Sequence, residues 1–75
     1  MLVKYGYTVA KQKDGNLLVT LVDFPTGVTE AANEAEAQVF AKEIAEGLIE
    51  AYQEDGLDLP KASPVGNNKF VEVTV

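Results

Sequence analysis

Carboxylates are the side chains of this sequence with the widest chemical scope. The 75-residue chain has 12 Asp and Glu residues, and it has no His, Cys, Trp or Arg. The missing imidazole and thiol groups exclude a Ser-His-Asp triad, a cysteine nucleophile and a metal site with His or thiolate ligands. A two-metal nuclease needs only carboxylates that converge on divalent ions. The candidates for that chemistry in the region of the predicted sheet are Asp14, Asp23 and Glu30.

Two of these three acids stand where Asp commonly has a structural role. Asp14 lies in the turn sequence of residues 13–16, where its side chain is expected to bond its own backbone. Asp23 opens an Asp-Phe-Pro corner at the end of a predicted strand. We therefore predict no catalytic residue, no cofactor and no metal ion, and a metal-dependent nuclease is the least favoured function.

The charge balance favours a protein partner over a nucleic acid. Six lysines against the 12 acids give a formal charge of −6. This charge repels phosphate, and without Arg the usual bidentate contacts to bases and phosphates cannot form. We expect no direct nucleic-acid binding and infer a cationic protein as partner. The alternative is that the acidic surface only maintains solubility.

The length and the apolar pattern predict one small domain over residues 1–75. A chain of this size buries only about 60% of its unfolded surface. No apolar run approaches the roughly 20 residues that cross a bilayer, and the first residues lack the features of a signal peptide. With no cysteine to form disulfides, we expect a cytoplasmic protein without membrane contact.

Four stretches of the sequence predict β-strands. Residues 3–10 alternate with the period of a half-buried strand, and the turn at residues 13–16 leads to a second strand at residues 17–22. Pro25 ends this hairpin because it has no N–H. Residues 27–30 allow only a short third strand. Residues 70–75 alternate again, with Val71 and Val73 on one face.

A single amphipathic helix follows the third predicted strand. Asn33 is a good N-cap, and Glu36 three residues later completes a capping-box pattern. Gly56 suits the residue after the helix, with Leu57 folding back on Tyr52 as in a Schellman ending. At about 100° per residue, the predicted apolar stripe comprises Ala37, Phe40, Ala41, Ile44, Leu48, Ala51 and Tyr52.

The predicted fold class is α+β with the order β-β-β-α-β. One small, mostly antiparallel sheet is covered on one face by the helix. A right-handed crossover through the helix would lay the last strand parallel to the first.

The ordered motifs of the chain resemble those of the HicB family of antitoxins. The matching residues are Asp23-Phe24-Pro25, Val28-Thr29, Glu36-Ala37, and Asp55-Gly56 with Pro60 and Ser63. Thr26-Gly27 stands where the family commonly has Gly-Cys, which implies a different turn conformation.

The resemblance implies a truncated ribonuclease-H-like fold without nuclease activity. It also implies that the protein, like the HicB family, binds and silences HicA, a small basic RNA-cleaving toxin with a double-stranded-RNA-binding fold. Many relatives carry a C-terminal DNA-binding segment. Because this sequence ends at Val75, directly after the last predicted strand, we expect operator binding to be absent or supplied by another protein.

The helix offers a candidate surface for such a cationic partner. Glu36, Glu43, Glu50 and Glu54 line up beside the apolar stripe, with Glu46 a little further round. Like charges this close cost a few tenths of a kcal/mol per pair. We interpret these four residues, together with Phe24 at the Asp-Phe-Pro corner, as the partner-binding candidates. The alternative is a solvated acidic face and a buried Phe24.

The last strand offers a second candidate surface. If residues 70–75 lie at a sheet edge, unpaired backbone groups of Phe70, Val71, Glu72 and Val73 would favour a homodimer or higher oligomer. The outward sheet face is also more apolar than an open face needs, with Ala10, Leu18, Val22 and Phe70. In the alternative arrangement, the loop of residues 57–68 covers that face. A solitary, self-associating domain without a toxin partner is the alternative function.

Overall fold

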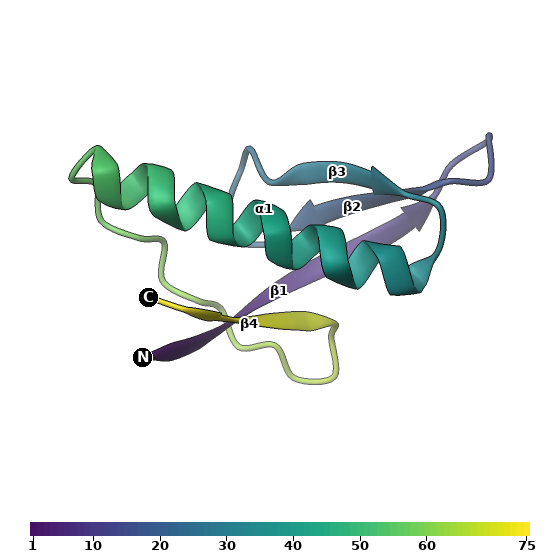
Figure 1. The fold of residues 1–75 in the computed structure, drawn as a ribbon. Helices are drawn as coiled ribbons and strands as arrows, with labels where there is room; N and C mark the ends of the chain where they lie inside the picture. Colours follow the sequence, from purple (N-terminus) through teal and green to yellow (C-terminus); the bar gives the residue numbers. More distant parts are fainter.

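The computed structural model describes all residues 1–75 and consists of one sheet and one helix. The helix α1 (Glu34–Glu54) lies across one face of the sheet (Figure 1). The sheet has the order β3-β2-β1-β4, with β1 (Leu2–Lys11), β2 (Leu17–Leu21), β3 (Val28–Ala31) and β4 (Phe70–Thr74). The predicted α+β class and the order β-β-β-α-β are confirmed.

The prediction that the last strand runs parallel to the first is wrong, because β1 and β4 pair antiparallel. The helix runs back along the sheet and advances by about 1.5 Å per residue. Residues 55–69, which we call the strap, then return the chain along the sheet before β4 begins. The crossover rule gives the handedness of a connection between parallel strands, and it does not apply here because the strap reverses the chain before β4 and makes β4 antiparallel to β1.

The central strand β1 is shared between two partners. Its second half, Tyr7 to Lys11, pairs with β2, and its first half, Leu2 to Gly6, pairs with β4. Val75 N–H donates to the carbonyl of Met1 at 2.9 Å, so the two ends of the chain lie side by side. The strand β4 therefore lies at one edge of the sheet, and β3 lies at the other.

Local signals fix both ends of the helix as the sequence predicts. The Asn33 side chain accepts from Glu36 N–H at 2.9 Å, and Glu36 Oε1 accepts from Ala32 N–H at 3.0 Å. Leu57 N–H bonds the Tyr52 carbonyl at 2.9 Å, and Gly56 has φ of 68°, which together make a Schellman ending. This helix is not sufficiently long and apolar to cross a membrane.

Small residues form the centre of the helix face that packs on the sheet. Ala37, Ala41 and Ala45 are fully buried. Their small size brings the helix close to the sheet, while larger side chains such as Phe40 and Tyr52 pack around them half-buried. The predicted stripe is therefore displaced: Ala51 is exposed, whereas Ala45 and Ile49 belong to the core. The full core comprises Tyr5, Tyr7, Val19, Leu21, Phe24, Ala31, Ala37, Ala41, Ala45, Ile49, Val71 and Val73.

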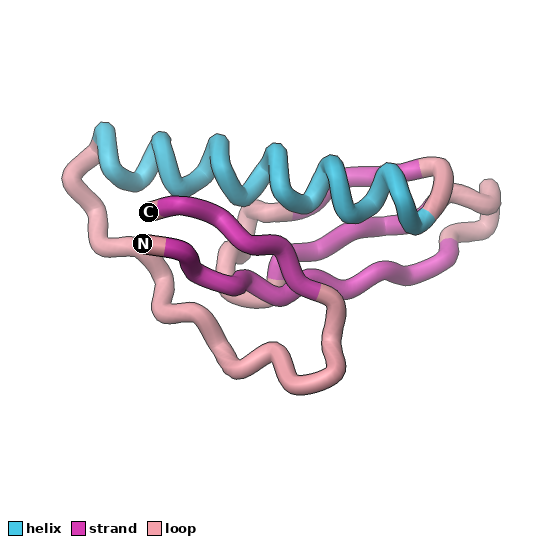
Figure 2. The backbone as a smooth tube through the Cα atoms, turned by 60° about the horizontal axis from the view of Figure 1, so that its bottom comes forward, coloured by secondary structure: helices cyan, strands magenta, loops and turns pink.

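The strap passes over the sheet on the side opposite the helix, which we call the outer face (Figure 2). A Cβ on Gly6 would point to this side and lie 3.5 Å from both Val22 and Val65 of the strap. The predicted alternative, in which the loop covers the outer face, is therefore confirmed for the strip around Gly6. Ala10, Val22 and Val28 remain exposed beyond it.

The Asp-Phe-Pro corner is a tight turn that presses on the core. Gly27 N–H donates to the Phe24 carbonyl at 2.9 Å, with Pro25 and Thr26 between them at negative φ. Pro and Gly take the positions that a type I turn favours for them. A Cβ on Gly27 would lie 2.6 Å from Leu21 Cδ1, so the buried Leu21 leaves room only for glycine.

Candidate partner-binding surfaces

The solvent-facing side of α1 carries acidic side chains without partners. Glu43, Glu50 and Glu54 are exposed, as is Glu46 beside them. None of them makes a side-chain hydrogen bond, and the ion pair of the structure joins Glu34 to Lys69 at 3.0 Å. We call Glu36, Glu43, Glu50 and Glu54 the acidic ridge. The placement of Glu43, Glu50 and Glu54 leaves their carboxylates free to meet a cation.

Glu36 differs from the other ridge residues because it already has a structural role. It is half-buried, and its Oε1 holds the Ala32 N–H as part of the N-cap. Its negative charge also lies at the positive end of the helix dipole, where it is favourable. Glu36 therefore contributes to helix initiation whether or not a partner binds.

The C-terminal end of the helix is acidic where a basic residue would be stabilising. The last turn has no Lys or Arg, and Glu54 and Asp55 lie at the negative end of the dipole. The hydrogen bond that Lys69 donates to the Glu34 carboxylate raises the pKa of Lys69, and this pairing occupies that lysine at the opposite end of the helix. The structure therefore leaves the acidic C-terminal half of the ridge without a neutralising lysine pair.

The interpretation of Phe24 as an exposed anchor is wrong. Its side chain is 0% exposed, and it packs edge-on between Tyr5, at a ring distance of 4.9 Å, and Tyr52, at 5.6 Å. The turn that follows Asp23 directs the ring inward under the C-terminal half of the helix. Phe24 is a core residue, and only the glutamates of the predicted partner-binding set reach the surface.

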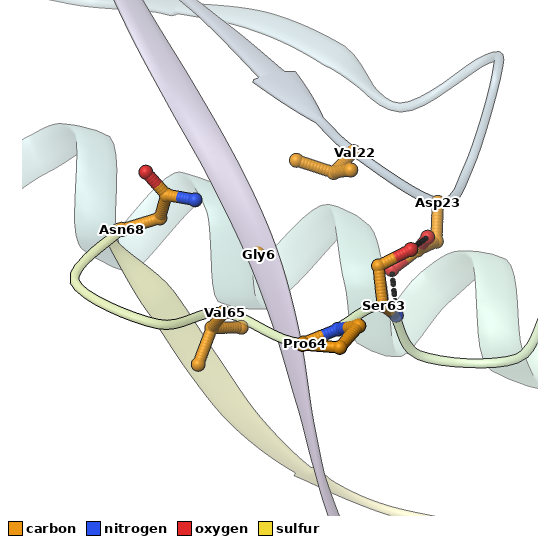
Figure 3. Close-up of a pocket in the computed structure, with 7 residues that line it drawn as sticks. All are labelled: Gly6, Val22, Asp23, Ser63, Pro64, Val65 and Asn68. Atoms are coloured by element: carbon orange, nitrogen blue, oxygen red, sulfur yellow. Dashed lines mark hydrogen bonds between the residues drawn. The ribbon is translucent and has the colours of Figure 1, made fainter.

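Asp23 fastens the strap to the end of β2. Its Oδ1 accepts from Ser63 Oγ at 2.6 Å and its Oδ2 accepts from Ser63 N–H at 3.0 Å (Figure 3). Tyr5 O–H donates to the Pro60 carbonyl at 2.7 Å. We call Tyr5, Asp23, Phe24, Pro60 and Ser63 the strap junction. Sequence reasoning found Asp23 and Ser63 as separate motif residues but missed that they bond each other.

Burial raises the pKa of Tyr5 at the strap junction. The Tyr5 side chain is 2% exposed. Burial raises the pKa of the Tyr5 phenol above its ordinary value of 10.0, and the nearby Asp23 carboxylate raises this pKa further. Tyr5 therefore stays protonated over the physiological range, as a donor to Pro60 must.

The three candidate metal-binding acids do not form a site together. Asp14 Oδ1 accepts from Asn16 N–H at 2.9 Å, which is the turn bonding that the sequence predicts. Both oxygens of Asp23 accept from Ser63, and Glu30 lies on β3. No group of three or more acidic side chains is placed to hold a metal ion. The hollow beside Asp23, lined by Gly6, Val22, Ser63 and Val65 among others, has a volume of about 30 Å³ and suits water rather than a substrate.

The strand β4 has buried valines on its inner side and carries Phe70 and the charged Glu72 on its outer side. Val71 and Val73 are buried against the helix, so their side chains cannot meet a partner. Phe70 is half-buried with Lys4 Nζ 4.9 Å from its ring centre, and Glu72 is exposed. The position of β4 at a sheet edge agrees with the sequence analysis, whereas self-association through that edge stays a prediction.

Comparisons with known proteins identify the fold. No protein-family profile matches the sequence, and no curated protein matches it. Among solved structures, the chain is similar to the crystal structure of the N-terminal domain of the antitoxin HicB from Burkholderia pseudomallei, with a TM-score of 0.77 and 20% sequence identity. The match covers 97% of this chain and 98% of that chain. This chain therefore has the fold of the HicB N-terminal domain over essentially its whole length.

Proposed function

We propose that this chain is a non-enzymatic, HicB-like antitoxin domain that binds and neutralises a small basic RNA-cleaving toxin of the HicA type. The fold shared with a HicB N-terminal domain over 97% of the chain supports this class of function. The sequence has no His or Cys, and two of the three candidate metal-binding acids, Asp14 and Asp23, are bonded within the fold. The molecule is therefore expected to act by binding a partner through its surface, and the main chemical feature of that surface is its negative charge.

The acidic ridge is the proposed docking surface for the toxin, and its unpaired state is the observation that carries the proposal. Glu50 and Glu54 are four residues apart and repel each other, and Glu43, Glu50 and Glu54 make no ion pair within the chain. Lys and Arg side chains of a basic partner would relieve this repulsion. Complementary charge of this kind accelerates association and selects the partner. A docked toxin would be held without contact between the antitoxin and RNA.

A charge-matched pair of variants tests this proposal. The probe is a catalytically inactive HicA-type toxin from the same genome, titrated calorimetrically at low and moderate salt. We expect the double variant Glu43→Gln/Glu50→Gln to weaken binding at least about tenfold. The control Glu30→Gln/Glu72→Gln removes the same charge from the sheet and should change the affinity less than about twofold.

Two results would contradict the proposal. An equal loss of affinity in both double variants would mean that net charge, rather than the ridge, attracts the toxin. Failure of the wild-type chain to bind the toxin at low salt would remove the antitoxin function, and the chain would then be a solitary domain.

A further inference from the structure

The C-terminal end of α1 holds an apolar side chain in water. Leu57 N–H donates to the Tyr52 carbonyl at 2.9 Å, and Gly56 N–H forms the second bond of the Schellman motif, to the Gln53 carbonyl at 3.2 Å. The residue in the position of Leu57 commonly packs on the residue in the position of Tyr52. Here the Tyr52 ring lies edge-on to Phe24, and Leu57 remains 57% exposed.

The backbone on both sides of Leu57 is fixed. Gly56 before it has the left-handed conformation that ends the helix, with φ of 68°. Pro60 after it accepts a hydrogen bond from the buried Tyr5 at 2.7 Å. A side chain on a backbone that is already ordered loses little conformational freedom on binding, which suits it to be an anchor.

Leu57 is also within reach of a large partner. The C-terminal end of α1 and the first part of the strap project beyond the ends of the strands in both views of the fold (Figures 1 and 2). Leu57 lies in this projecting segment, directly after the helix ends.

Carboxylates flank this apolar side chain. Glu54, Asp55 and Asp58 are exposed and lie within three residues of Leu57 along the chain. None of them belongs to the ion pair of the structure, which joins Glu34 to Lys69 at the other end of the helix. The last turn has no basic residue, so the negative end of the helix dipole adds to these charges. This end of the helix therefore combines an apolar side chain with a field that attracts cations.

We propose that Leu57 anchors this chain in an apolar pocket of the basic toxin, and that Glu54, Asp55 and Asp58 pair with Lys or Arg side chains at the rim of that pocket. The inference rests on the proposed function and adds an apolar contact to it. An apolar centre inside a polar rim is the common arrangement of a protein interface. Glu54 also belongs to the acidic ridge, so the anchor and the ridge form one continuous surface.

The charges around Leu57 argue against two other occupants. Two copies of this chain would bring their carboxylate rims together and repel each other. An anionic lipid surface would be repelled in the same way. A basic protein is the occupant whose charge complements both the rim and the ridge.

Calorimetric titration with the catalytically inactive HicA-type toxin tests the anchor. Leu57→Ala should weaken binding about tenfold, because it removes apolar surface that the toxin would bury. Leu57→Met keeps the apolar volume and should bind within about threefold of the wild-type chain. Val39→Ala is the matched control, because Val39 is 54% exposed on the same helix but lies far from its C-terminal end. The control should change the affinity less than about twofold.

Ionic strength separates the anchor from the acidic ridge. Salt screens charge pairs but does not screen the burial of an apolar side chain. The factor lost in Leu57→Ala should therefore be the same at low and moderate salt, whereas the factor lost in Glu43→Gln/Glu50→Gln should shrink as salt increases.

The outcomes distinguish this inference from the proposed function. If the wild-type chain binds the toxin and Leu57→Ala binds it equally well, the anchor alone is overturned. Equal losses in Leu57→Ala and Val39→Ala also overturn it, as does a Leu57→Ala variant that separates copies of the free chain without changing the toxin affinity. If the wild-type chain does not bind the toxin, the proposed function is overturned and the anchor with it. Circular dichroism of each variant verifies the fold.

Discussion

At the strap junction, both oxygens of Asp23 accept hydrogen bonds from Ser63, whereas Glu43, Glu50 and Glu54 of the acidic ridge accept none. Both regions contain a carboxylate that the sequence marks as a functional candidate. The difference lies in what surrounds the charge. At the junction the neighbours are donors from a distant part of the chain, and along the ridge they are other carboxylates and water.

This contrast separates residues that maintain the fold from residues that are available for binding. A change at the strap junction should lower the free energy of unfolding. A change on the exposed part of the ridge should leave this free energy unchanged or raise it. The sign of the stability change therefore tests the assignment of each residue, independently of any partner.

The largest effect is expected from Phe24→Ala. This substitution removes a fully buried ring from between Tyr5 and Tyr52, and it should cost about 3–5 kcal/mol of unfolding free energy. Such a loss approaches the whole stability of a small domain. Urea denaturation followed by circular dichroism measures it.

Val39→Ala is the control for this prediction, because it trims an exposed apolar side chain on the helix and should change stability by less than about 0.5 kcal/mol. Similar losses in the two variants would mean that the ring of Phe24 does not fill the core as described.

Most of the fold follows from local signals in the sequence, and the exceptions are contacts between distant segments. The helix ends could be predicted because Asn33, Glu36 and Gly56 act within a few residues of their own positions. The direction of β4 could not, because it depends on the path of the strap. That path is held by Asp23 and Ser63, which are 40 residues apart.

The candidate surfaces show the same division. Exposure of Glu43, Glu50 and Glu54 follows from helical periodicity, whereas the burial of Phe24 depends on the turn that ends at Gly27. The predicted helix stripe contains Ala37 and Ala41 but omits Ala45 and Ile49, because the sequence does not show how the helix is rotated about its axis on the sheet. The packing of helix and sheet sets that rotation and buries Ala45 and Ile49.

A smaller effect is expected from Tyr5→Phe. The variant loses the hydrogen bond to the Pro60 carbonyl, which should cost about 1 kcal/mol near neutral pH. The pKa of Tyr5 is raised in the folded state above 10.0, so the folded chain holds this proton more tightly than the unfolded chain. That contribution to stability is complete below pH 10 and is lost as the pH rises through the folded pKa.

The alkaline half of this prediction is the difference between the wild-type chain and Tyr5→Phe, because that difference isolates the Tyr5 phenol from every other group of the chain. Urea denaturation at neutral pH and at several values above pH 10 should show a steeper loss of stability in the wild-type chain than in Tyr5→Phe. Parallel curves would mean that the Tyr5 phenol is solvated and that the strap is not held at Pro60.

The smallest effect, and the one of opposite sign, is expected from Glu50→Gln. The substitution keeps the shape of the side chain and removes one of the like charges of the ridge, which should raise the unfolding free energy by a few tenths of a kcal/mol. Added salt screens the same repulsion, so the gain should shrink as ionic strength increases. Thermal unfolding at low and high salt measures it. A loss of stability at low salt would show that Glu50 has a favourable partner within the chain. The Glu50 carboxylate would then stabilise the fold, as the Asp23 carboxylate does at the strap junction.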